Sequence, residues 1–148
     1  MEISCKSEYA LLALIELAVA YESGDPLQIR QISAQQNIPD RYLEQLLATL
    51  RRGGIVRSQR GAKGGYLLAR EPWKITLFDV LVCLEGFDSQ PINQETALKS
   101  GKTLEGSIVC EIWQEANDAA NAVFQKYTLK DLRERRDARR QLDFMYYI

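Results

Sequence analysis

The segment from residue 39 to residue 68 constrains the fold most, because a helix with one leucine face runs directly into a glycine-rich stretch. Four leucines recur at the spacing i, i+3, i+4 and i+7, which places on one helical face Leu43, Leu46, Leu47 and Leu50. The opposite, solvent-facing side then carries Arg41, Gln45, Ala48 and Arg52. Gly53 and Gly54 end this helix. The segment therefore predicts an amphipathic helix followed by a tight turn.

Cationic side chains gather around that turn. Residues 51–63 hold five basic side chains and no acidic one: Arg51, Arg52, Arg57, Arg60 and Lys63. Residues 55–58 and 64–68 predict two short strands of a hairpin. Glycines let a backbone approach a phosphate, and cations neutralise it, so the hairpin is typical of a DNA contact. A nucleotide-binding loop is disfavoured, because the spacing G-x-x-x-x-G-K-[ST] and a preceding parallel-sheet pattern are both missing.

Two further helices are expected before this unit. The first runs from the N-cap Ser4 to near Glu22, with apolar positions at Tyr9, Leu12, Ile15 and Val19. The second covers residues 29–36 and stops before Pro39, because proline biases the preceding residue away from helix. The leucine-faced helix itself begins at Pro39 or Asp40.

A fourth helix is expected after the hairpin, over residues 77–85. Thr76 and Asp79 have the spacing of a capping box, and Gly86 closes the helix. From there to residue 106 the chain has no hydrophobic period and is rich in Ser, Gly, Asn and Gln. We expect a loop of about 20 residues, a length that in a compact domain usually serves function or mobility.

A long helix is expected over residues 107–127. Its apolar side chains are spaced 3, 4, 3 and 4, the seam of a coiled coil, at Val109, Ile112, Ala116, Ala119 and Val123. Thr128 and Asp131 form a second capping pair that opens a strongly charged helix. Residues 144–148 are unusually apolar for a chain end, so we expect them to dock on a dimer or to offer a partner surface.

Composition excludes several classes of protein. The chain has no histidine, which removes the commonest general acid or base and every imidazole metal site, so it is not expected to be an enzyme. Its three cysteines are widely spaced and form no C-x-x-C pair, which favours a reducing cytoplasm over a disulfide framework. No basic signal segment and no run of about 20 apolar residues is present, so neither export nor a membrane contact is expected.

The order of these elements is that of a winged helix-turn-helix domain, and the residues resemble one family in particular. The segments SEYAL (7–11), IPDRYLEQLL (38–47) and above all SQRGAKGGYLLA (58–69) closely resemble the Rrf-two family of bacterial transcription regulators. The resemblance runs from Met1 to about Leu132, and includes ITLFDV (75–80) and LEG (84–86). The expected fold is mainly α with a small β-hairpin, a winged helix-turn-helix domain plus a long C-terminal dimerisation helix.

The resemblance implies a homodimeric regulator, expected to act as a repressor, that binds a palindromic site on double-stranded DNA. We expect three parts: a DNA-binding domain at 1–86, a flexible sensor-type loop at 87–106, and a dimerisation helix with a tail at 107–148. Expected DNA contacts are Arg41, Tyr42, Gln45, Arg52, Arg57, Ser58, Arg60 and Lys63. The coiled-coil seam independently favours a homodimer.

Some relatives implied by the resemblance carry an iron-sulfur cluster on three cysteines of the loop, with a histidine or a partner's N-terminal acidic residue as fourth ligand. This chain departs from that pattern, because residues 87–105 contain no cysteine and no histidine. Glu8 matches the acidic ligand, and Cys83 and Cys110 are the remaining redox or cluster candidates. We therefore predict no cofactor and no metal site, and keep an iron-sulfur or redox-sensing regulator as an alternative. Another alternative is a protein-interaction subunit controlled by a partner enzyme.

Overall fold

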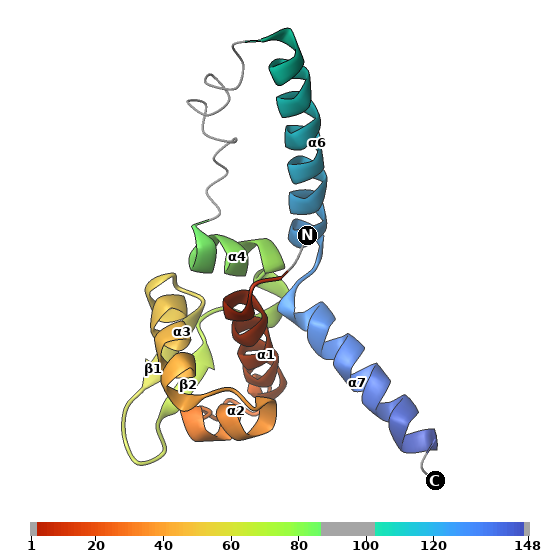
Figure 1. Ribbon diagram of the computed structural model, residues 1–148. Helices are drawn as coiled ribbons and strands as arrows, with labels where there is room; N and C mark the ends of the chain where they lie inside the picture. The colour runs from red at the N-terminus through yellow and green to blue at the C-terminus, as the bar shows by residue number, and fades with distance from the viewer. Residues whose placement is uncertain (1–2, 87–102, 147–148) are drawn as a thin grey trace.

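The computed structural model describes residues 3–86 and 103–146. Its elements, in chain order (Figure 1), are α1 (Cys5–Ala20), α2 (Ile29–Gln36), α3 (Asp40–Arg52), β1 (Val56–Gln59), β2 (Gly65–Leu68), the short 3-10 helix η1 (Pro72–Lys74), α4 (Leu77–Glu85), α6 (Leu104–Lys126) and α7 (Leu129–Tyr146). The mainly helical fold with one small hairpin confirms the predicted fold class. None of the helices within residues 3–86 and 103–146 combines the length and the hydrophobicity that a membrane span requires.

Helix boundaries follow local capping chemistry. The hydroxyl of Ser4 accepts a hydrogen bond from the backbone N–H of Ser7 at 3.2 Å, which starts α1 as predicted. Thr76 and Asp79 form the predicted capping box at the start of α4, with bonds of 3.0 and 3.1 Å. At the end of α2, Asn37 takes the left-handed conformation at φ 54°, a C-terminal cap that this residue type tolerates.

The core lies where α1, α3 and α4 pack against one another. The four leucines of α3 are all buried, as the spacing predicted. The prediction for α1 was wrong in detail, because its fully buried residues include Ala10, Ala13 and Leu14, whereas Val19 is exposed. Helix α1 contacts α2, α3, α4, β2 and α7, and small alanines on its inner face permit that close approach.

The hairpin is antiparallel, with Val56 opposite Leu68 and Gln59 opposite Gly65. Each predicted strand is shifted or shortened by about one residue, since β1 begins at Val56 and β2 at Gly65. An isolated bridge between Leu27 and Tyr66 ties the hairpin to the chain before α2. A Cβ atom at Gly65 would lie 2.4 Å from the carbonyl oxygen of Leu27, so this close approach requires glycine.

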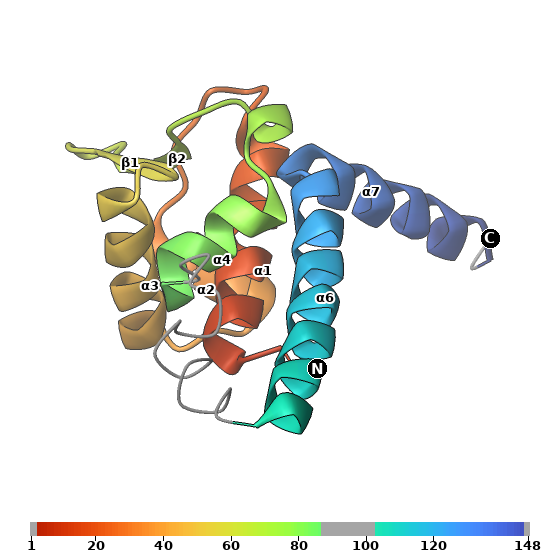
Figure 2. The same cartoon turned by 90° about the horizontal axis from the view of Figure 1, so that it is seen from above.

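The two C-terminal helices diverge from a common junction beside α4, as Figures 1 and 2 show. Backbone hydrogen bonds of 2.9 Å, from Leu77 N–H to Tyr127 O and from Leu129 N–H to Ile75 O, fasten this junction. Helix α6 begins at Leu104 and not at Ser107, because the Thr103 hydroxyl caps it by accepting from Gly106 N–H at 3.0 Å. The predicted loop is therefore shorter at its end, and residues 87–102 lie outside the described part of the chain.

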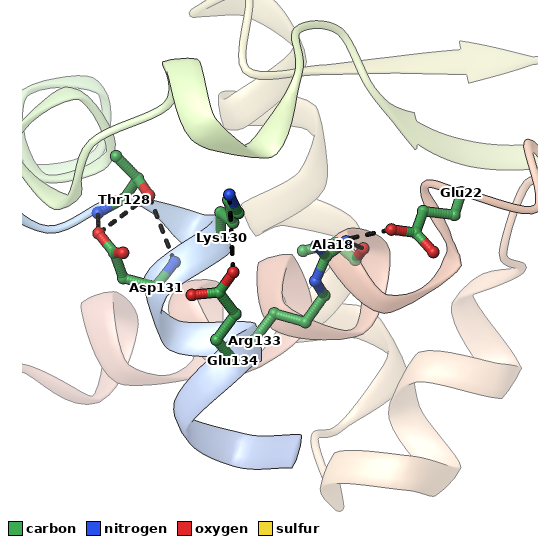
Figure 3. A network of polar contacts seen from close by, with 7 residues as sticks. All are labelled: Ala18, Glu22, Thr128, Lys130, Asp131, Arg133 and Glu134. Carbon is green, nitrogen blue, oxygen red and sulfur yellow. Dashed lines mark hydrogen bonds and ion pairs between the residues drawn. The ribbon is translucent and has the colours of Figure 1, made fainter. Parts of the chain in front are cut away.

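The first turns of α7 are fastened to α1 by polar contacts (Figure 3). The predicted capping pair is present, with Thr128 N–H donating to Asp131 Oδ2 at 2.8 Å. The guanidinium of Arg133 donates to Ala18 O at 3.1 Å and lies 3.8 Å from the Glu22 carboxylate. Farther along, Arg136 lies 3.8 Å from Glu16 Oε1. These contacts fix the direction in which α7 leaves the bundle formed by α1 to α4.

Glu16 is a buried carboxylate, 6 % exposed, inside this helix assembly. Besides Arg136, it accepts a hydrogen bond of 2.6 Å from the side-chain amide of Gln36 at the end of α2. A buried charge is tolerated only when it is paired and hydrogen-bonded, and both conditions hold here. Glu16 therefore joins α1, α2 and α7. In the sequence it is recognisable only as a charged residue within an apolar stretch.

Candidate nucleic-acid interface

The outer face of α3 is the central part of the candidate interface. Arg41, Gln45 and Arg52 are exposed, opposite the buried leucines, as the helical spacing predicted. At the C-terminal end, Arg52 Nη2 donates to the hydroxyl of Thr49 at 3.2 Å, which restrains the guanidinium. The long cationic and amide side chains of this face are the types that read base edges in a major groove.

Tyr42 differs from the other residues of α3 that were expected to contact DNA. Its side chain is half-buried, and its ring meets that of Tyr9 edge to face, with centroids 5.6 Å apart and an interplanar angle of 78°. The ring packs against the hydrophobic core between α1 and α3. Tyr42 therefore contributes packing, and only its remaining exposed part can reach a ligand.

The hairpin lies beside α3 at one end of the molecule, as both ribbon views show (Figures 1 and 2). Its residues Arg57, Ser58, Arg60 and Lys63 are all exposed. Arg51 Nη1 lies within 3.5 Å of Ser58 Oγ and donates a hydrogen bond to it, which joins the end of α3 to β1. Arg51 was not among the expected DNA contacts. It belongs to the basic segment 51–63, and this membership could have identified it as a candidate.

The segment that forms α3 and the hairpin is strongly positive. Between residues 40 and 70 the chain holds seven Lys or Arg and two acidic residues, Asp40 and Glu44. Asp40 lies in the first turn of α3, where a negative side chain interacts favourably with the helix dipole. An excess of five positive charges over residues 40–70 attracts a polyanion even though the whole chain has a net charge of -1.

The predicted seam of α6 is open to solvent in the single chain. Val109, Ile112 and Val123 are 62 %, 61 % and 51 % exposed, and Ala116 and Ala119 are exposed as well. No residue of α6 is buried. Large apolar side chains in such a row usually mark a protein contact. The dimerisation role of the seam stays a prediction.

The end of α7 is also apolar and exposed. Its exposed large side chains are Leu142, Phe144, Met145 and Tyr146. Residues 147–148 lie outside the described residues. Whether this end docks on a dimer or on a partner protein stays a prediction.

The cluster candidates do not converge. Cys5 and Glu8 are exposed at the start of α1, Cys110 is half-buried two turns into α6, and Cys83 lies under the end of α3. Within residues 3–86 and 103–146, no three His, Cys, Asp or Glu side chains are grouped so that they could hold a metal ion. The donor set of these described residues therefore does not fit an iron-sulfur cluster.

Cys83 fills a small space beneath the C-terminal end of α3. Its thiol donates to Thr49 O at 3.5 Å, and a Cβ atom at Gly53 would lie 2.2 Å from its sulfur. Burial raises the pKa of the Cys83 thiol, while the cations of Arg52 and Lys6 oppose that rise. The protonated thiol is the weaker nucleophile, so this environment favours packing over redox sensing.

Gly53→Ala is expected to destabilise the protein by about 1 to 3 kcal/mol, because the added methyl overlaps the Cys83 sulfur. The backbone of Gly53, at φ -80°, accepts alanine without strain, so the effect isolates this contact. In the double variant Gly53→Ala with Cys83→Ala, much of the loss should be recovered. Urea unfolding of the native protein, the two single variants and the double variant measures the coupling free energy between the two sites. Strictly additive losses of stability would contradict the contact.

Comparisons with known proteins agree with this geometry. A family model described as Rrf2, "Iron-dependent Transcriptional regulator", matches residues 3–135. The chain is 37 % identical over 148 residues to the "HTH-type transcriptional regulator CymR" of Bacillus subtilis (strain 168), and covers 100 % of both chains.

Solved structures give the same result. The chain is similar to "T. potens IscR", with a TM-score of 0.75, 32 % identity, and coverage of 93 % of this chain and 88 % of that one. It is also similar to CymR, "the Global Cysteine Regulator of B. subtilis", with a TM-score of 0.70 and 34 % identity, over 90 % of this chain and 97 % of that one. The exposed basic helix beside a basic hairpin thus occurs in a chain that belongs to the Rrf2 (Rrf-two) family of DNA-binding transcription regulators.

Proposed function

We propose that this regulator binds a palindromic operator as a homodimer and represses transcription from it. The observation that carries the proposal is the row of exposed Arg41, Gln45 and Arg52 on α3, beside a hairpin with exposed Arg57 and Arg60. We assign these parts a regulatory and not a catalytic role, and a cytoplasmic place of action, where bacterial DNA is found.

The two basic elements take different tasks in this proposal. Helix α3 enters the major groove, where Arg41 and Gln45 can make paired hydrogen bonds to guanine and adenine edges. The hairpin contacts the phosphate backbone, because its exposed side chains include three cations and a serine that suit phosphate oxygens. Specificity then comes from α3 and much of the affinity from the hairpin.

Homodimerisation supplies the symmetry of the operator. In the proposed dimer the α6 seam of one chain covers the seam of its partner, which removes exposed apolar area from water. A two-fold axis then presents two copies of α3 to half-sites separated by about one turn of DNA, roughly 34 to 36 Å.

Arg41→Ala tests base reading by α3. On an operator selected from a random duplex library, the variant should lose about 1 to 3 kcal/mol of binding free energy and tolerate more bases at one position. Fluorescence anisotropy at several salt concentrations gives both quantities. Arg139→Ala, which removes an exposed arginine from α7, is the matched control and should leave binding nearly unchanged. Unaltered affinity and sequence preference in both Arg41→Ala and Gln45→Ala would refute the role of α3.

A further inference from the structure

One buried oxygen atom connects the helix-turn-helix unit with the C-terminal helix α7. Gln36 Nε2 donates a hydrogen bond of 2.6 Å to Glu16 Oε1, and Arg136 Nη2 lies 3.8 Å from the same oxygen. Gln36 and Arg136 are themselves half-buried. These three residues form the Glu16 link. It joins a group from α2 and a group from α7, which lie far apart along the chain.

Helix α2 has few other attachments to the rest of the bundle. It has eight residues, of which Ile32 is buried and Ile29 is half-buried. Within residues 3–86 and 103–146, the bond from Gln36 to Glu16 is the one side-chain hydrogen bond that joins α2 to α1. A hydrogen bond to an ionised carboxylate is stronger than one between neutral groups. The position of α2 against α1 therefore depends strongly on this bond.

A short and well-bonded turn passes the position of α2 on to α3. Gln36 is the last residue of α2, and α3 begins at Asp40. Across the turn, Ser33 Oγ donates to Ile38 O at 2.6 Å, and Ile38 N–H donates to Ser33 O at 3.2 Å. Ile38 itself is buried. We therefore expect α2 to move together with the first turn of α3, which carries Arg41.

Arg136 compensates the charge of Glu16. A carboxylate that is removed from water is stable only when cations and hydrogen-bond donors replace its hydration. Among the described residues, Arg136 supplies the one ion pair that Glu16 makes. Without this cation the carboxylate is more stable where water can hydrate it, and turning outward breaks its bond to Gln36. Arg136 thus acts on α2 through Glu16.

We propose that Glu16 is a positioning residue for the DNA-reading helix α3, and that Arg136 makes α7 a part of the DNA-binding unit. Figures 1 and 2 place α7 and the hairpin on opposite sides of α1, so α7 acts here without touching DNA. Arg136 holds Glu16, Glu16 holds Gln36, and α2 sets the direction in which α3 enters the groove. The inference rests on the proposed function, because it requires that α3 reads the bases.

Arg136→Met, which removes the charge and keeps an unbranched side chain, is the first test. In the DNA-free protein, the backbone amide NMR signals of Asp40 and Arg41 should shift, although both residues belong to another helix. Operator affinity, measured by fluorescence anisotropy, should fall by about tenfold, because only the fraction of molecules with a correctly placed α3 binds.

Arg133→Met is the matched control. Arg133 lies one helical turn before Arg136, is also half-buried, and also fastens α7 to α1, by donating to Ala18 O at 3.1 Å. Its ion pair, however, is with Glu22 and not with Glu16. The control should lower thermal stability and leave the amide signals of Arg41 and the operator affinity nearly unchanged. An equal loss of affinity in Arg133→Met would overturn the proposal, because docking of α7 would then suffice.

Gln36→Ala breaks the link at its other end. It leaves the ion pair between Arg136 and Glu16 in place and adds a good helix former to α2, so the variant should fold. Operator affinity should fall about as far as in Arg136→Met. The variant with both changes should bind no more weakly than the weaker single variant, because both act through one hydrogen bond. Losses of affinity that add would overturn the proposal.

A rescue experiment separates position from charge. Glu16→Gln, combined with Arg136→Met, leaves an amide oxygen that accepts from Gln36 and no buried charge, so most of the lost affinity should return. Glu134→Gln, combined with Arg136→Met, changes the net charge equally at an exposed site of α7 and should restore nothing. Equal recovery in both would overturn the proposal, since net charge would then control the affinity.

Thermal unfolding followed by circular dichroism checks that each variant is folded at the temperature of the measurements. The NMR signals and the operator affinity distinguish the two levels of inference. Shifted signals at Asp40 and Arg41 in a protein without sequence-specific DNA binding would support the Glu16 link and refute the proposed function. Normal operator affinity and unchanged signals in both Arg136→Met and Gln36→Ala would overturn the link and leave the proposed function standing.

Discussion

Ala119→Glu is expected to convert the proposed homodimer into monomers and to lower affinity for a palindromic operator by about a hundredfold or more. Two-fold pairing of the α6 seams brings the new carboxylate into an apolar contact together with its symmetry mate. Removing an ion from water without a partner is strongly unfavourable. Ala119 is exposed in the single chain and glutamate is a good helix former, so the chain itself should still fold.

Sedimentation equilibrium at micromolar concentration measures the oligomeric state, and anisotropy on full and half operators measures the consequence for DNA binding. Ala122→Glu, which adds the same charge on another exposed face of α6, is the matched control and should remain a dimer. A native protein that sediments as a monomer would show that the α6 seam has another role.

Combined replacement of Arg57, Arg60 and Lys63 by alanine is expected to weaken binding to the operator and to random duplex by similar factors. Each lost phosphate contact should reduce the slope of log K against log salt by about 0.9, so the triple variant should lose about 2 to 3 in slope. The physical reason is that backbone contacts release counterions whatever the base sequence.

The control for this experiment removes three cations elsewhere: Arg135, Arg139 and Arg140 on α7, all exposed. Its net charge equals that of the hairpin variant, so a general effect of charge would change both proteins alike. Loss of operator binding with unchanged binding to random duplex would mean that the hairpin reads bases, contrary to the prediction.

Local signals in the sequence predicted most of the helical boundaries. Helices α2 and α4 begin and end where the sequence places them, because capping residues and Pro39 determine helix ends through contacts within a few residues. The hairpin was placed to within about one residue for the same reason. The start of α6 was missed, because the cap Thr103 lies in a polar stretch that resembles the preceding loop.

The exposure of most candidate DNA contacts could also be predicted from the local sequence. Exposure of Arg41, Gln45 and Arg52 follows from the leucine period of a single helix, and exposure of the hairpin cations follows from their charge. Tyr42 shows the limit of this reasoning, since its burial depends on Tyr9 of another helix. A side chain's spacing along its own helix does not specify what lies across from it.

The helices and strands, their caps and the basic segment could be predicted from the sequence, because these depend on interactions between residues close along the chain. Packing between distant segments revealed which face of α1 is buried, that Glu16 joins three helices, and that Cys83 lies against Gly53. Each of these features is a contact between segments far apart in sequence, and periodicity along one segment carries no information about the surface that packs against it.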